Sequence, residues 1–216
     1  MANVTYLIET GASAGNEKWG FLREHSSKAN GKDPLTGLHR TGLDEYLSVI
    51  FPNTDDWIRD QMFGEHNGVK YRIRPDYRSD SLKLIVEFDG LPHYQDPAVI
   101  IKDDKNTEIY RQNGYKVVRI PYFIQLTNEA VEKMFGVRVD EPLFNVYYPS
   151  LGGVEMKHNP SCLCPEGLKR MAREFKNFSE QYEVNLQSLK AMNNEILSGV
   201  NYLIEEYNKY NYGKRY

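Results

Sequence analysis

The chain has 216 residues, of which 40% are hydrophobic and 26% are charged, enough for one sizeable core with a small appendage. Its formal net charge of −3 excludes an argument for nucleic-acid binding from overall charge, so such a function must rest on a local site. No run approaches the roughly 18 apolar residues that span a bilayer, and the amino terminus lacks the pattern of a signal peptide. Cys162 and Cys164 are too close together for an ordinary disulfide, which indicates free thiols. We therefore expect a soluble, cytoplasmic protein that does not associate with membranes.

A short amphipathic helix is predicted just after residue 40. In the stretch T-G-L-D-E-Y-L-S-V-I-F-P, Leu43, Leu47 and Ile50 recur at helical spacing. Pro52 ends the pattern, because proline cannot continue a helix. Asp44 and Glu45 are carried by this helix.

Two stretches rich in β-forming residues follow, K-Y-R-I-R-P-D-Y and L-K-L-I-V-E-F-D. The polar turn R-S-D-S between them predicts an antiparallel hairpin. Residues 100–113 predict a helix that stops at Gly114, and Y-K-V-V-R-I-P predicts another strand. The order helix, hairpin, helix, strand predicts an α/β (α+β) fold with a mixed sheet flanked by helices.

The carboxy-terminal part of the chain predicts a helical extension. A helix is expected over residues 128–135, and an irregular link with several prolines and glycines follows it. Beyond Pro165, apolar residues recur every three or four positions or at sums of these, which predicts one long helix or a helical hairpin. These residues are Leu168, Met171, Phe175, Phe178, Tyr182, Leu189, Ile196, Val200, Leu203 and Tyr207.

Three carboxylates are predicted to meet at one end of the sheet. Alternation along the strand ending in E-F-D-G places Glu87 and Asp89 on one face, together with Lys83 and Ile85. Hairpin pairing can bring Asp76 beside Glu87. Like charges so close repel unless a cation lies among them, and oxygen ligands favour Mg²⁺, with Mn²⁺ as a substitute. For any one of these carboxylates alone, a turn cap at Asp76 or a solvated strand face at Glu87 and Asp89 would be the better interpretation, and the metal site is favoured only by the three together with the motif that follows.

The ordered motif resembles the core of the PD-(D/E)XK nuclease superfamily. R-P-D-Y is followed, eleven residues after Asp76, by E-F-D-G-L-P-H. The pattern is similar to the very-short-patch-repair endonuclease branch, in which a histidine, a helix that opens with aspartate, a glycine and a V-x-R strand come next. The corresponding residues here are His93, Asp103, Gly114 and 117–119. The resemblance implies four segments: an amino-terminal segment over 1–40, a catalytic core over 41–140, an irregular link over 141–167 and a helical extension over 168–216.

Membership in this superfamily would give roles to several residues. Asp76 is the expected central metal ligand, Glu87 a second and the backbone carbonyl of Phe88 a third, while Glu45 resembles an acidic residue that the first helix turns toward the metal. The sequence departs from the family where Asp89 replaces the lysine of the superfamily name. Lys83, Lys102 or Lys105 could supply the missing charge. His93 is a candidate general base or acid, since imidazole titrates near neutrality, although a packed histidine is an alternative.

Basic residues near this site are the candidates for contact with DNA. Three arginines flank the predicted catalytic aspartate, and two lysines lie on the helix that follows the hairpin. A further arginine lies on the last strand of the core, and a run of basic residues lies on the extension. A solvated face is the usual meaning of such a run. The predicted DNA-binding residues are Arg72, Arg74, Arg78, Lys102, Lys105, Arg119, Arg170 and Arg173.

The sequence therefore predicts a magnesium-dependent endonuclease acting on double-stranded DNA, with Asp76, Glu87, Asp89 and His93 as catalytic residues. A type II restriction enzyme is favoured, because the core takes less than half of the chain and leaves segments for base recognition. A repair or phage-type nuclease and a catalytically silent DNA-binding subunit are the alternatives. The long apolar stripe of the extension could pack on its own domain or form a homodimer.

Overall fold

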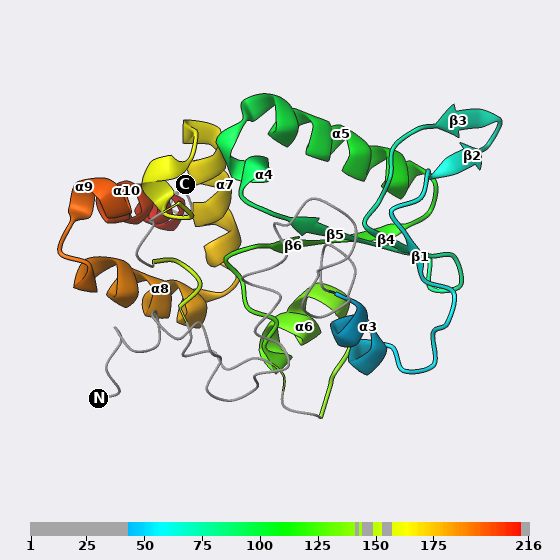
Figure 1. The fold of residues 1–216 in the computed structure, drawn as a ribbon, viewed down its shortest axis with the longest axis horizontal. Coiled ribbons are helices and arrows are strands. Elements are labelled where there is room, and N and C mark those ends of the chain that lie inside the picture. Colours follow the sequence, from blue (N-terminus) through cyan, green and yellow to red (C-terminus); the bar gives the residue numbers. More distant parts are fainter. Residues whose placement is uncertain (1–42, 141–142, 144–148, 153–156, 213–216) are drawn as a thin grey trace.

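A four-stranded mixed sheet lies at the centre of the molecule, and helices cover both of its faces and one end (Figure 1). The computed structural model describes residues 43–140, 143, 149–152 and 157–212, so the amino-terminal segment over 1–40 lies outside the described residues. The predicted mixed sheet flanked by helices is confirmed. The strands are β1 (Ile58–Arg59), β2 (Gly64–His66), β3 (Val69–Tyr71), β4 (Tyr77–Ser79), β5 (Leu84–Asp89) and β6 (Lys116–Pro121). The helices are α3 (Asp44–Ile50), α4 (Pro92–Gln95), α5 (Pro97–Gln112), α6 (Asn128–Phe135), the 3-10 helix η2 (Pro160–Cys162), α7 (Pro165–Phe175), α8 (Ser179–Ala191), α9 (Glu195–Ser198) and α10 (Val200–Tyr212).

Strand β5 is the central strand of the sheet, whose order is β1-β4-β5-β6. It runs antiparallel to β4, with Tyr77 opposite Val86, and parallel to β6, with Glu87 opposite Arg119. A parallel pair needs a crossover connection, and α5 provides it. All six residues of β5 are buried, so Glu87 and Asp89 lie inside the protein and not on a solvated strand face.

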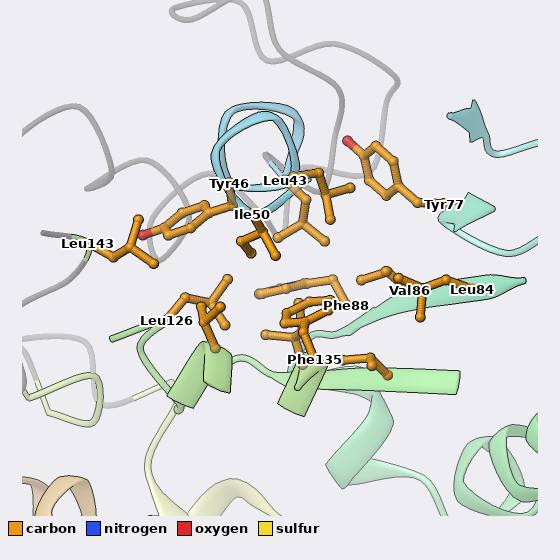
Figure 2. Close-up of a cluster of buried hydrophobic side chains, with 14 residues drawn as sticks. Leu43, Tyr46, Ile50, Tyr77, Leu84, Val86, Phe88, Leu126, Phe135 and Leu143 are labelled. Carbon is orange, nitrogen blue, oxygen red and sulfur yellow. The ribbon is translucent and has the colours of Figure 1, made fainter. Parts of the chain in front are cut away.

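The first core fills the face of the sheet covered by α3 and α6 (Figure 2). The helix predicted from Leu43, Leu47 and Ile50 is confirmed as α3, and all three residues are buried. The predicted helix over 128–135 is confirmed as α6, where the Thr127 side chain accepts a hydrogen bond from the backbone N–H of Ala130. The apolar faces of both helices, together with the cap of α6, fix them against β5 and β6.

Helix α5 covers the opposite face. It extends the predicted helix by three residues at its start, where the Asp96 side chain accepts a hydrogen bond of 2.8 Å from the N–H of Ala98. The helix ends before Gly114, whose φ of +84° favours glycine. Tyr110 of this helix packs with Ile85 in a small cluster completed by Phe63 and Tyr115. Tyr115, the residue just before β6, is thereby packed against the helix that precedes it.

The predicted hairpin is correct in direction but shorter than expected. Of the first predicted stretch, only the part after Pro75, which forms β4, pairs with β5. Pro75 interrupts the pairing ahead of Asp76, because proline has no N–H to donate. The preceding residues 69–71 form β3, which pairs with β2 in a separate hairpin. Its turn residues Asn67 and Gly68 have φ of +52° and +76°, as a two-residue type I′ turn requires. The sequence N-G was the signal for this hairpin, and the sequence prediction missed it.

The prediction of one long helix or a helical hairpin at the carboxy terminus is wrong. The segment folds into α7, α8, α9 and α10. Asn193 and Gly199 break it, with φ of +51° and +66°. Most of the apolar stripe is buried in a second core, against Tyr94, Phe123 and Ile124 of the central segment. Ile196 is the exception, with 79% of its surface exposed.

We predict that Gly167→Ala destabilises the protein, although alanine is normally the better helix former. A Cβ at Gly167 would lie 1.8 Å from the backbone oxygen of Tyr94, so α7 would have to move away from α4. The expected loss is about 3 kcal/mol in the free energy of unfolding, measured by urea denaturation. Gly90→Ala is the matched control, because a Cβ there meets its nearest atom at an ordinary 3.7 Å. Equal stability of the two variants would contradict the close packing of α7 on α4.

Candidate metal and ion-pair site

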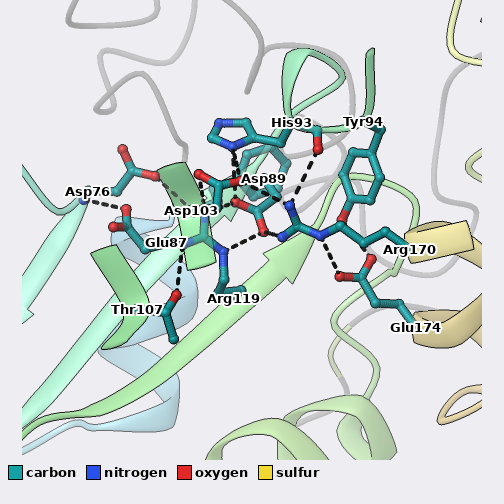
Figure 3. A network of polar contacts seen from close by, with 11 residues as sticks. Asp76, Glu87, Asp89, His93, Tyr94, Asp103, Thr107, Arg119, Arg170 and Glu174 are labelled. Atoms are coloured by element: carbon teal, nitrogen blue, oxygen red, sulfur yellow. Dashed lines mark hydrogen bonds and ion pairs between the residues drawn. The ribbon is translucent and has the colours of Figure 1, made fainter. Parts of the chain in front are cut away.

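Asp76 and Glu87 meet where β4 begins and β5 ends, as predicted (Figure 3). The backbone N–H of Asp76 donates a hydrogen bond of 3.1 Å to Oε2 of Glu87. The N–H of Phe88 donates one of 2.8 Å to Oδ2 of Asp76. Both acidic residues are buried, at 7% and 9% exposure. The antiparallel pairing of β4 with β5 therefore holds the two carboxylates side by side.

The environment of this pair disfavours two negative charges. Burial and, after it, the neighbouring charge of Asp76 together raise the pKa of Glu87 to about 8, although Arg119 acts in the opposite direction. A cation between the two carboxylates would relieve this cost. The donor set consists of hard oxygens, which suits Mg²⁺ or Mn²⁺.

The backbone carbonyl of Phe88 faces the same side of the strand as Asp76. The N–H and C=O of one strand residue point the same way, and the Phe88 N–H is bonded to Asp76. This carbonyl can therefore supply a third oxygen beside Asp76 and Glu87. Glu45 lies in α3, but its side chain is outside the described residues.

Asp89 does not join these carboxylates as the sequence analysis expected. Its side chain has no exposed surface and binds the guanidinium groups of Arg119 and Arg170. The Nε of Arg119 donates a hydrogen bond of 2.8 Å to Oδ2 of Asp89. Because two cations already neutralise this carboxylate, the predicted cluster of three carboxylates around one metal reduces to Asp76 and Glu87.

His93 and Asp103 form a hydrogen-bonded pair next to this ion network. The Nδ1 of His93, in α4, lies 2.8 Å from Oδ2 of Asp103, in α5, and 3.4 Å from Oδ1 of Asp89. Burial acts to raise the pKa of Asp103, but the hydrogen bond with His93 and the charge of Arg119 outweigh it, and the pKa is lowered. An ionised Asp103 can hold a proton on Nδ1, which leaves Nε2 as the proton acceptor of the imidazole.

Asp89, His93 and Asp103 also have ligand atoms within 4.8 Å of one another, a spacing that a metal ion could use. The charges around them argue against that use. Arg119 contacts both carboxylates, and Arg170 contacts both as well. A divalent cation would have to displace two guanidinium groups from a buried position, so the pair of Asp76 and Glu87 is the better candidate for metal.

The predicted DNA-binding residues fall into three groups. Arg78 is half-buried, donating a hydrogen bond of 2.8 Å to the carbonyl of Phe63 and pairing with Asp80. Arg119 and Arg170 belong to the ion network, and Arg170, at 8% exposure, was wrongly placed on a solvated helix face. The exposed members of the set are Arg72, Arg74, Lys102, Lys105 and Arg173.

Among the described residues, no contact with Asp76 or Glu87 is seen for Lys83, Lys102 or Lys105, the lysines expected to supply the charge that the PD-(D/E)XK motif would place at Asp89. The ammonium of Lys83 lies 4.9 Å from the ring centre of Tyr115, in the turn before β5. Lys102 and Lys105 are exposed on α5. The cation in register with Glu87 is Arg119, on β6. The alternation of residues along V-V-R-I-P could have predicted that Arg119 lies beside Glu87. Arg170 could not be predicted in this way, because it lies in a run of basic residues on the extension.

A pocket of about 700 Å³ lies beside the network and not over the carboxylate pair. It follows the outer edge of β6, and its lining includes Arg119, Lys133, Glu174 and Lys176. Burial raises the pKa of Glu174 to about 7, against the opposing effect of Arg170. Asp76, Glu87 and His93 are not among the lining residues, so the chemistry proposed below does not rely on this pocket.

Comparisons with known proteins add no relative from which a role could be transferred: no family model, no curated protein and no solved structure matches the chain. Among the described residues, no helix has the length and apolar character needed to cross a membrane.

We predict that Glu87→Gln stabilises the metal-free protein at pH 8. A carboxyl group whose folded-state pKa is raised stabilises the fold while it is protonated, and this contribution is lost between its ordinary value of 4.5 and about 8. The amide avoids the loss and can still accept the hydrogen bond from Asp76. Urea unfolding in a chelator should show the variant roughly 1–3 kcal/mol more stable at pH 8 and nearly equal to the parent at pH 4. A variant less stable than the parent at pH 8 would refute the assignment of a strained acidic pair.

Proposed function

We propose that this protein is a metal-dependent endonuclease that hydrolyses phosphodiester bonds of double-stranded DNA. The observation that carries the proposal is the buried pair of Asp76 and Glu87, whose carboxylates each accept a hydrogen bond from a backbone N–H of the paired strands. The resemblance of R-P-D-Y and E-F-D-G to the PD-(D/E)XK motif points to the same chemistry. A type II restriction enzyme is the favoured form, acting in the cytoplasm.

Each residue of the site has a distinct task in this mechanism. Asp76, Glu87 and the carbonyl of Phe88 would hold the Mg²⁺ or Mn²⁺ ion. When bound, the ion would neutralise charge on the scissile phosphate and lower the pKa of an attacking water. His93, held through Nδ1 by Asp103, presents Nε2 to take a proton from the nucleophile or to give one to the leaving oxygen. Asp89 and Arg119 orient the pair of His93 and Asp103 and would not contact the substrate.

The β2–β3 hairpin is the proposed arm for DNA contact, because it leads directly into the metal site. Lys70, Arg72 and Arg74 are exposed along this segment, immediately before Asp76. A two-stranded ribbon fits the major groove of B-DNA, and basic side chains beside it would bind phosphates. His66 stacks on Phe63 with ring centres 4.0 Å apart, which anchors the ribbon to the core. Lys102, Lys105 and Arg173 are exposed candidates for further phosphate contacts.

One assay distinguishes the restriction enzyme from three other functions. Plasmid and genomic DNA are incubated with the protein and Mg²⁺ or Mn²⁺, and the products are resolved on gels. Discrete fragments support a restriction enzyme, a smear supports a nonspecific nuclease, and nicks support a repair-type or phage-type enzyme. DNA binding without cleavage in either metal would overturn the enzyme proposal and favour a silent DNA-binding subunit.

We predict that Asp76→Ala and Glu87→Ala abolish cleavage while DNA binding is retained or strengthened. Each change removes a metal ligand and also relieves repulsion of the phosphates. Asp104→Ala, which removes an exposed carboxylate of α5, is the control and should cleave normally. Cleavage is followed on plasmid and binding by fluorescence anisotropy in Ca²⁺. Activity above a few percent in either site variant would sink the metal-site assignment.

We predict that His93→Ala lowers kcat by roughly 10²-fold with little change in KM, because proton transfer at Nε2 occurs only in the transition state. Binding of Mg²⁺, followed by calorimetry on the same sample, should be unaffected, since His93 is not one of the proposed ligands. A variant with the parent's kcat would reduce His93 to a packing residue.

A further inference from the structure

Arg170 reaches the candidate site from a helix outside the predicted catalytic core. It lies on α7, yet its guanidinium contacts residues of β5, α4 and α5 (Figure 3). Its NH1 donates a hydrogen bond of 2.9 Å to Oδ2 of Asp103, and its NH2 binds Asp89. With an exposure of 8%, it is buried in the described part of the structure.

The guanidinium holds His93 at two points. The Asp103 oxygen that binds Arg170 is the same oxygen that binds Nδ1 of His93. The NH1 of Arg170 also lies 3.3 Å from the backbone carbonyl of His93. One planar group therefore sets both the main chain of the histidine and the carboxylate that orients its ring.

Arg170 is itself held firmly enough to act as a fixed reference. Its Nε donates a hydrogen bond of 3.0 Å to Glu174, one helical turn further on, and its guanidinium carbon lies 4.9 Å from the ring centre of Tyr94. Tyr94 in turn donates a hydrogen bond of 2.7 Å to Glu174. The approach of Gly167 to the backbone of Tyr94 fixes α7 against α4. These contacts leave the guanidinium little freedom to rotate.

We infer that Arg170 is a positioning residue, which sets the ring orientation and tautomer of His93 through Asp103. The inference rests on the proposed function for its catalytic consequence, but its structural content does not depend on that function. The charged groups around the imidazole are Asp89 from β5, Asp103 from α5, Arg119 from β6 and Arg170 from α7. Arg119 binds the other oxygen of Asp103, so removing Arg170 leaves the carboxylate charged but unfixed on the side that faces His93.

The test compares Arg170→Lys and Arg170→Met with the exposed Arg111→Met as the matched control. Lysine keeps the charge but cannot donate to Asp89, Asp103 and Glu174 at the same time. This variant keeps the test usable if the methionine protein does not fold. The ring nitrogens of His93 are observed by ¹⁵N NMR in the metal-free full chain, with assignment by loss of the signal in His93→Gln.

The parent should show a single His93 tautomer with the proton on Nδ1. In Arg170→Lys, the His93 signals should shift or broaden, and kcat should fall roughly tenfold or more with KM little changed. The Arg111→Met protein should match the parent in both measurements. If the His93 spectrum and kcat of folded Arg170→Lys equal those of the parent, the inference is overturned. If no variant, including the parent, cleaves DNA, the proposed function fails while the NMR comparison still decides the role of Arg170.

Discussion

The carboxylate of Asp89 lies between two guanidinium groups that come from different parts of the chain. Arg119 approaches from the neighbouring strand β6 and Arg170 from helix α7, and Asp89 itself has no exposed surface. Removing one partner from such a buried pair leaves an uncompensated charge, at a cost of about 3–5 kcal/mol. This interaction links α7 to β5 and β6, and the same two arginines bind Asp103, which orients His93.

The same interaction divides the candidate site into two halves. On one side, Asp76 and Glu87 form a buried acidic pair with an unfavourable charge balance, as the raised pKa of Glu87 indicates. On the other side, the negative charges of Asp89 and Asp103 are matched by two arginines. Asp89 stands where the PD-(D/E)XK motif would place a lysine, yet cations are present next to it, because β6 and α7 supply guanidinium groups. These groups are paired with carboxylates, so they are better suited to fixing geometry than to binding a free phosphate.

Local patterns predicted α3, α5, α6 and the three strands β4, β5 and β6, but they did not predict the β2–β3 hairpin or the breaks in the carboxy-terminal segment. Helical patterns and stop signals identified α3, α5 and α6, and the expected hairpin pairing placed Asp76 beside Glu87, since these signals depend only on residues close in sequence. The apolar spacing of the extension ran through Asn193 and Gly199, because their left-handed conformations interrupt the helix without interrupting the pattern. Arg170 could not be separated from its exposed neighbours, since its burial follows from a carboxylate 81 positions earlier in the chain. Burial of a charge is a tertiary property, and no helical period encodes it.

The extension therefore has a different meaning from the one its sequence suggested. Its apolar stripe was an argument for a dimer interface because it seemed larger than a small core needs, but Met171, Phe175 and Leu203 are buried against the central segment. Residues buried in the core of their own chain cannot also form a dimer interface, and the buried part of this stripe completes the second core. The homodimer remains a prediction. It rests on the argument that an enzyme that cuts both strands of a duplex needs two active sites or two successive visits. If two copies do assemble, their contact must use residues outside this buried set, such as the exposed Ile196, since α7 already holds the candidate site of its own chain together.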